Sequence, residues 1–161
     1  MGEGDPGRRR LFDLFRQSTE RVLPVWTSER PEDDRPTRMI ELGEGIFTGG
    51  IEEAATKSEY DRFVVDLDNL ADEIGGRAYA AGRAAADLVS TAAVGDYADD
   101  TPRDADDEDL DPDVMSSDYF ASLAEASFFG APDEDPDARR AFWRWYLEEA
   151  VPAAYRAVED D

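Results

Sequence analysis

An alanine-rich stretch, residues 77–98 with the sequence RAYAAGRAAADLVSTAAVGDYA, sets the fold class. Small residues lie near one face of it at helical spacing: Ala78, Gly82, Ala85, Ala86, Val89 and Ala93. Small side chains at four-residue steps let the backbones of neighbouring helices approach closely. Half-buried strands would show apolar residues at every second position, and the sequence contains no such run. The stretch therefore predicts a helix in the middle of an all-α bundle.

Three helices are expected before this stretch. The first runs over residues 9–23, where apolar residues recur at helical spacing, and Pro24 falls at its end. The second begins at Asp33 or Asp34, since either carboxylate can act as an N-cap. Gly49-Gly50 is a stop signal for this second helix.

Helix-start signals also mark the other elements. Ser58 begins a capping-box-like pattern, which predicts the start of a third helix. Ser117 is expected to cap a short helix over residues 118–129. Pro136 follows an aspartate and opens the last helix, which Pro152 should kink or end.

These elements form one domain. We expect a disordered leader over residues 1–8 and a helical domain over residues 9–158, with about five to seven helices around one core. Residues 96–117 are rich in aspartate and are interpreted as an acidic loop or insertion within that domain.

The net charge of −23 comes from 40 acidic and 17 basic residues, and Lys57 is the single lysine. A disordered acidic tail would cluster its charge and lack aromatic residues, whereas acids run along this whole chain. A nucleic-acid mimic would also be acidic. The excess of Asp over Glu and the near absence of Lys favour adaptation to multimolar salt, that is, a halophilic protein that repels nucleic acid.

Salt adaptation predicts a stability that depends on ionic strength. Salt screens the mutual repulsion of the surface carboxylates, so we expect the melting temperature to fall when KCl is lowered from multimolar to low concentration. An unchanged melting temperature across that series would contradict the halophilic interpretation.

The residue types that are missing restrict the chemistry. The chain has no Cys and no His, which excludes disulfides, a thiolate nucleophile, sulfur-ligated metals and the usual near-neutral base. No phosphate-binding loop or nucleophile elbow is present. We therefore expect neither an enzyme nor a cofactor or metal site. No apolar run reaches the roughly 18 to 20 residues of a membrane span, and a cytoplasmic protein is expected.

The segment RPEDDRP, residues 30–36, joins the first two predicted helices. Pro36 presets the first turn of the second helix. Arg35 can reach a carboxylate or the last carbonyls of the first helix. Two interpretations stay open: a rigid structural corner, or a surface that contacts a partner. The site candidates are Asp33, Asp34, Arg35 and Pro36.

The aromatic group in the last helix gives one more candidate. Helical spacing places Trp143 and Tyr146 on one side, where core packing is expected. Trp145 points elsewhere, and we expect it to be half exposed, so it joins the partner-binding candidates.

The order of these segments resembles a family of immunity proteins of bacterial polymorphic-toxin systems, the family numbered five, and its close relatives. The matching corner positions are Pro31, Asp33, Asp34, Arg35 and Pro36, with Arg21 to Pro24 before them and Ile40 and Glu41 after them. The resemblance covers residues 15–97 and, more loosely, 141–155. The chain departs from the family pattern because it has no His in the alanine-rich helix and has Gly45, Ile46 and Phe47 where a Trp is usual.

The resemblance implies an all-helical fold and a non-catalytic role, in which the protein binds and neutralises a toxin-like protein domain. Two alternatives remain from the residues themselves. Carboxylates could bind a divalent metal or a small ligand, or the acidic surface could mimic nucleic acid.

Overall fold

The computed structural model describes residues 6–93 and 116–159, and these residues form helices and connecting turns without a β-strand. The α-helices are α1 (Pro6–Glu29), α2 (Arg35–Phe47), α3 (Glu53–Leu70), α4 (Gly76–Ala92), α5 (Ser117–Ala126), α6 (Pro136–Trp145) and α7 (Val151–Glu159). A π-helical turn, η1 (Tyr146–Ala150), connects α6 to α7. The all-α bundle predicted from the sequence is confirmed. Residues 94–115, most of the expected acidic loop, lie outside the described residues.

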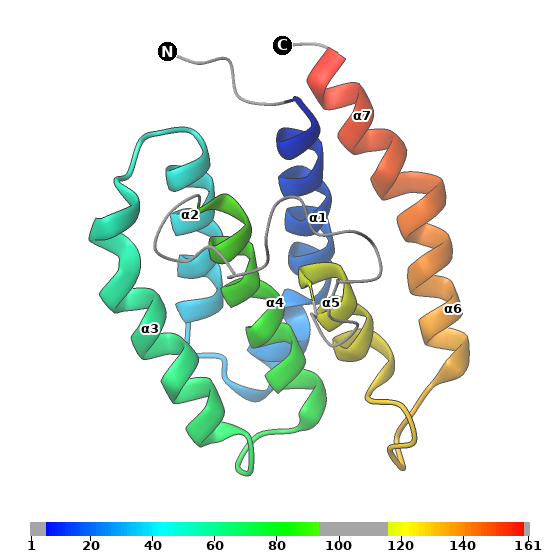
Figure 1. The fold of residues 1–161 in the computed structure, drawn as a ribbon. Coiled ribbons are helices and arrows are strands. Elements are labelled where there is room, and N and C mark those ends of the chain that lie inside the picture. Colours follow the sequence, from blue (N-terminus) through cyan, green and yellow to red (C-terminus); the bar gives the residue numbers. More distant parts are fainter. Residues whose placement is uncertain (1–5, 94–115, 160–161) are drawn as a thin grey trace, which may run out of the picture.

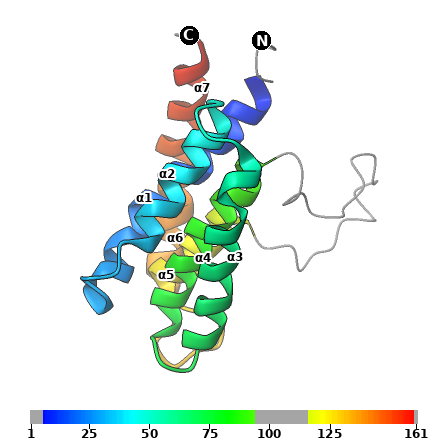
Figure 2. The same cartoon turned by 90° about the vertical axis from the view of Figure 1, so that its left-hand side faces the viewer.

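The alanine-rich helix α4 lies in the middle of the bundle, as its sequence predicts. It packs against α1, α2, α3 and α5, and Figures 1 and 2 show it surrounded by these helices. Close approach requires a glycine at position 82. A Cβ atom there would lie 2.6 Å from Leu67 Cδ2 and 3.0 Å from Trp26 Cζ3. The small residues of α4 therefore bring α1 and α3 together around one core.

Helix α1 is longer than the sequence predicts at both ends. It continues through Pro24 to Glu29, because the buried residues Val22 and Trp26 extend its apolar face beyond the proline. Pro24 is exposed, so the carbonyl left without an intrahelical donor can be solvated by water. At the other end, Pro6 to Arg8 of the expected leader are helical, and the Arg8 guanidinium donates to the Ala92 carbonyl at 2.6 Å. Residues 1–5 lie outside the described residues.

The prediction that a helix starts at Ser58 is wrong. Helix α3 begins at Glu53, and Ser58 is an exposed residue within it. The preceding turn explains the earlier start. Gly49 has a φ of +74°, which ends α2, and the Ile51 side chain then packs on Gly45, where a Cβ would lie only 2.4 Å from Ile51 Cδ1. Because the turn is complete by residue 52, residues 53–57 form the first part of α3.

The start of α5 also differs from the prediction. Ser116 occupies the N-cap position, and Ser117 is the first helical residue. The Ser117 hydroxyl group lies 3.0 Å from both the Ala84 carbonyl and the Asp87 carboxylate, so its partners are on α4. Helix α5 ends at Ala126 rather than at residue 129, because Ser127 takes a positive φ of 68°.

The C-terminal segment forms one continuous rod from α6 through η1 to α7. The Asp135 carboxylate accepts from the backbone N–H groups of Asp137 and Ala138, and Pro136 occupies the first turn, as predicted. Pro152 does not end the helix. A proline ring clashes with the carbonyl four residues earlier, here Glu148, and the wider η1 turn lies at that carbonyl. In Figure 1 the rod runs beside α1, and the end of α7 lies close to the start of α1.

Candidate functional site

The corner between α1 and α2 is organised by Asp33. Its carboxylate accepts the Arg35 backbone N–H at 3.2 Å, Arg35 Nε at 2.8 Å and Arg35 Nη2 at 2.7 Å. Arg30 Nε donates to the same carboxylate at 3.3 Å. The Asp33 backbone carbonyl in turn accepts from Trp26 Nε1 at 2.9 Å. The corner is thus fixed to the buried indole at the end of α1.

The two aspartates of the corner have different roles. Asp34 occupies the N-cap position of α2, but it is exposed and its side chain makes no capping hydrogen bond. Asp33, one residue earlier, binds the first N–H of the helix instead. Pro36 is buried in the first turn of α2, as the sequence predicts.

Arg35 links the corner to α3. Its Nη1 atom lies 2.7 Å from Asp66 Oδ2, and its guanidinium carbon lies 5.4 Å from the centre of the Phe63 ring. Hydrogen bonds from Arg35 lower the pKa of the Asp33 carboxyl from its usual value, and the same carboxylate raises the pKa of Arg35. Both groups are therefore ionised at neutral pH and hold α1, α2 and α3 in register.

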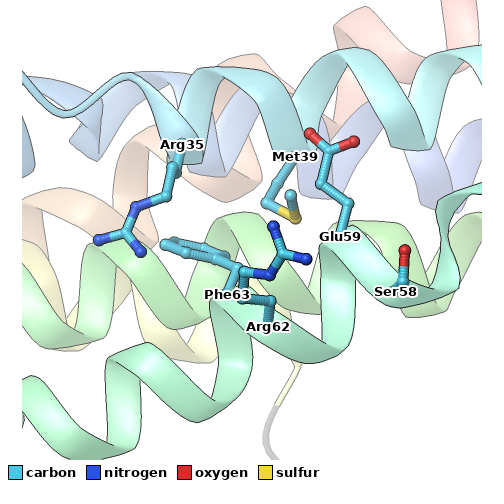
Figure 3. A pocket seen from close by; sticks show the side chains of 6 residues that line it. All are labelled: Arg35, Met39, Ser58, Glu59, Arg62 and Phe63. Atoms are coloured by element: carbon cyan, nitrogen blue, oxygen red, sulfur yellow. The ribbon is translucent and has the colours of Figure 1, made fainter.

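A cavity of about 400 Å³ opens between α2 and α3 beside the corner. Figure 3 shows Arg35 and Met39 reaching it from α2, and Ser58, Glu59, Arg62 and Phe63 reaching it from α3. Buried Met39 and Phe63 give it an apolar floor. Arg38 outside the cavity pairs with Glu59 at 2.9 Å. We call this cavity and its six lining residues the α2–α3 groove.

Arg62 differs from the other arginines around the groove. It is exposed, and it has no ion pair or hydrogen bond within residues 6–93 and 116–159, whereas Arg35 and Arg38 are each held by carboxylates. Sequence reasoning missed Arg62 because its signal, one arginine on a helix, is not distinctive. Its position becomes evident only when α2 lies against α3.

A second, more open cavity of about 490 Å³ lies on the outer side of the corner, lined by residues 29–35. Arg35 lines both cavities, so a molecule that occupied either would contact the same side chain. Asp33 and Asp34 line the outer cavity. Asp33, Asp34 and Arg35 therefore share one surface with the α2–α3 groove, whereas Pro36 is buried and lines neither cavity.

Trp145 does not lie at this surface. It is half-buried, as expected, and sits on α6, across the bundle from α2 and α3 in Figure 1. Its ring packs 5.6 Å from the Phe142 ring and 4.5 Å from the guanidinium of Arg21, which pairs with Glu125 at 2.8 Å. Trp145 thus links α6 to α1 and α5.

The two aromatic residues expected in the core, Trp143 and Tyr146, are also half-buried. Their rings meet edge to face at 5.2 Å. The Tyr146 hydroxyl donates to Asp118 at 2.7 Å, and burial raises the pKa of Tyr146 well above its ordinary value. These residues pack against the core without being enclosed by it, because the rod lies on the outside of the bundle.

Replacing Arg35 tests how much the corner contributes to stability. We expect Arg35→Ala to lower the free energy of unfolding at pH 7 by about 1–2 kcal/mol, because it removes partly exposed charge-assisted bonds to two carboxylates. Arg38→Ala is the control and should cost about 0.5 kcal/mol or less, since its pair with Glu59 is exposed. Urea unfolding measures both.

The pH dependence of the same variant has a definite sign. Because Arg35 lowers the pKa of Asp33, the stability it contributes is present above the ordinary Asp pKa and is lost as pH falls through the lowered value. The difference between wild type and Arg35→Ala should therefore shrink in acid. A loss at pH 7 no larger than that of Arg38→Ala would contradict the corner's structural role.

Within the part of the chain that the structure describes, no three acidic side chains gather closely enough to hold a metal ion. The described helices also include none that is long and apolar enough to cross a membrane. The corner and the groove offer guanidinium groups, carboxylates and an apolar floor, which are the means of binding another molecule.

Comparison with protein families connects this arrangement to known sequences. The family described as Immunity protein Imm5 matches residues 2–153. The match includes the corner, the groove, α4 and most of the C-terminal rod. Comparison with curated proteins finds no match.

Proposed function

The chain belongs to the Imm5 family of immunity proteins, and we propose that it neutralises a partner toxin domain by binding it, without catalysis. The family match over residues 2–153 is the observation that carries this function. A non-catalytic mode is supported by the composition, since a chain without Cys or His has no thiolate nucleophile and no imidazole base.

We further propose that the toxin domain contacts the corner and the α2–α3 groove. Exposed Arg62 supports this, because it is an arginine beside an apolar floor of Met39 and Phe63. Arginine and aromatic side chains dominate the energy of many protein interfaces. Arg62 has no ion pair with another described residue. A carboxylate of the toxin domain could therefore form an ion pair with it.

A pull-down with a charge-reversal variant tests the function and the surface separately. The tagged wild-type protein is incubated with native lysate in multimolar KCl, and the bound proteins are identified by mass spectrometry. We expect one of them to contain a toxin domain, which is then purified for affinity measurements. Failure to recover a toxin domain in repeated experiments would contradict the proposed function.

Arg62→Glu should weaken the affinity for the purified toxin domain by about tenfold or more, because it replaces attraction by repulsion at a contact. Arg144→Glu is the matched control. Arg144 is also an exposed arginine, but it lies on α6, away from the groove. The affinity of the Arg144→Glu variant for the toxin domain should stay within about twofold of the wild-type affinity. If Arg62→Glu and Arg144→Glu bind the toxin domain with equal affinity, the α2–α3 groove is not the contact surface. The proposal that this protein binds a toxin domain would still stand.

A further inference from the structure

Apolar side chains are exposed together on the side of the bundle formed by α1, η1 and α7. Leu11 is 45% exposed, Leu147 66% and Tyr155 53%. The other exposed large apolar residues in the described part, Val65 and Phe129, lie on α3 and after α5. Clustered exposure of this kind is typical of an interaction surface, whereas single exposed apolar residues need no explanation.

These residues border a shallow groove between α1 and α7. The groove has a volume of about 200 Å³, and its apolar lining comes from Leu11 and Leu14 on α1 and from Val151, Ala154 and Tyr155 on α7. Leu147 precedes Val151 by four residues, a spacing that places it on the same side of the rod. We call the groove together with Leu147 the α1–α7 patch.

Charges of opposite sign lie at the two ends of this patch. Arg10 and exposed Arg156 are at the end where α1 begins, and the Arg10 guanidinium lies 4.5 Å from the Tyr155 ring. Exposed Glu148 and Glu149 are at the other end, beside Leu147. None of the four forms an ion pair with another residue among 6–93 and 116–159. Arg10 Nε is also buried without a hydrogen-bond acceptor there.

A basic end, an apolar middle and an acidic end make the patch complementary to itself. When two copies face each other across a two-fold axis that lies in the interface plane and is perpendicular to the long direction of the patch, the basic end of each lies over the acidic end of the other. The apolar residues then meet in the middle. An interface between identical surfaces related in this way is the commonest basis of protein dimers.

We propose that the α1–α7 patch is the interface of a homodimer. Helices α2 and α3, which form the α2–α3 groove, lie across the bundle from α7 in Figure 1, so each copy keeps that groove accessible in the dimer. The proposal is independent of the toxin-binding function, because it rests on the exposure and charge of other residues.

Salt should control this association. Two copies with a net charge of −23 each repel one another at low ionic strength. At 1 M salt the screening length is about 3 Å, which removes long-range repulsion but leaves contacting charge pairs and apolar burial largely intact. The dimer is therefore expected in concentrated KCl and should dissociate as KCl is lowered.

Sedimentation equilibrium in 1 M KCl measures the mass directly. We expect the wild type to show twice the chain mass of 17.9 kDa and the variant Leu147→Glu to show the monomer mass. Val65→Glu is the matched control, since Val65 is similarly exposed at 57% but lies on α3, and it should remain dimeric. Circular dichroism checks that all three are folded. A monomeric wild type in concentrated KCl, or a dimer that Leu147→Glu leaves intact, would overturn the proposal.

A charge-swap experiment tests the two-fold arrangement. Arg10→Glu alone, and the double variant Glu148→Arg/Glu149→Arg alone, each place like charges opposite one another and should be monomeric. A mixture of the two restores opposite charges at both ends and should form a heterodimer. Failure of the mixture to associate would overturn the arrangement. If instead the wild type is monomeric and Leu147→Glu loses toxin binding, the patch belongs to the toxin and the homodimer proposal is wrong.

Discussion

Trp26→Ala is expected to lower the free energy of unfolding by about 3–5 kcal/mol, the range for removing a fully buried aromatic side chain. The Trp26 side chain has no exposed surface and meets the Phe63 ring edge to face at 6.1 Å. It also fills the space that Gly82 leaves between α1 and α4. Its loss therefore opens a cavity where three helices meet. Urea unfolding followed by circular dichroism measures the change.

Two variants separate the contributions of Trp26. Trp26→Phe keeps a ring but removes the N–H that donates to the Asp33 carbonyl, and an intermediate loss is expected. Trp145→Ala removes an indole that is only half-buried and should cost less than Trp26→Ala. If Trp26→Ala and Trp145→Ala destabilise equally, Trp26 is not the central packing residue between α1, α3 and α4.

Asp87→Asn is expected to stabilise the protein at neutral and alkaline pH. Although Asp87 as a residue is half-buried, its carboxyl is nearly desolvated where α4 meets α5, and this burial raises its pKa to about 6. Hydrogen bonds from Ser117 and the charge of Arg83 offset part of this burial effect, whereas the charge of Asp118 adds to it. An asparagine at this position avoids the cost of an ionised carboxylate and can still hydrogen-bond the Ser117 hydroxyl.

The pH dependence follows from the raised pKa of Asp87. The unfolded chain releases the proton near pH 4 and the folded chain only near pH 6, so wild-type stability falls as pH rises between these values and is level above them. Asp87→Asn should therefore gain about 3 kcal/mol at pH 8 and roughly half of that at pH 5. Asp72→Asn is the control, since Asp72 is exposed, and it should change little. A gain that does not depend on pH would contradict the assignment.

The sequence determines much of this fold through local signals. The small residues of α4 predict its central position, and Pro36 predicts the start of α2, because both signals depend on the residues themselves. Other local signals are misleading where tertiary packing overrides them. Pro24 does not end α1, since burial of Trp26 favours a continued helix. Ser58 does not begin α3, since the turn fixed by Gly49 and Ile51 starts that helix earlier.

The candidate site was predictable only in part. The corner residues Asp33, Asp34, Arg35 and Pro36 are adjacent in the sequence, and they are adjacent in the structure because one turn holds them. Arg62 joins them from α3, and Trp145 lies elsewhere. Both placements depend on how the helices pack in three dimensions, which the spacing of residues along single helices does not specify.

The direct test of non-catalytic immunity is a titration of toxin activity. A fixed amount of the purified toxin domain is mixed with increasing amounts of this protein in multimolar KCl, and the residual activity is measured after equilibration. Binding predicts that activity falls linearly and reaches its minimum at one toxin domain per chain. Neutralisation by far less than one chain per toxin domain would indicate catalysis, and full toxin activity at excess protein would show that this toxin is not the partner. Either result would contradict neutralisation of that toxin by stoichiometric binding.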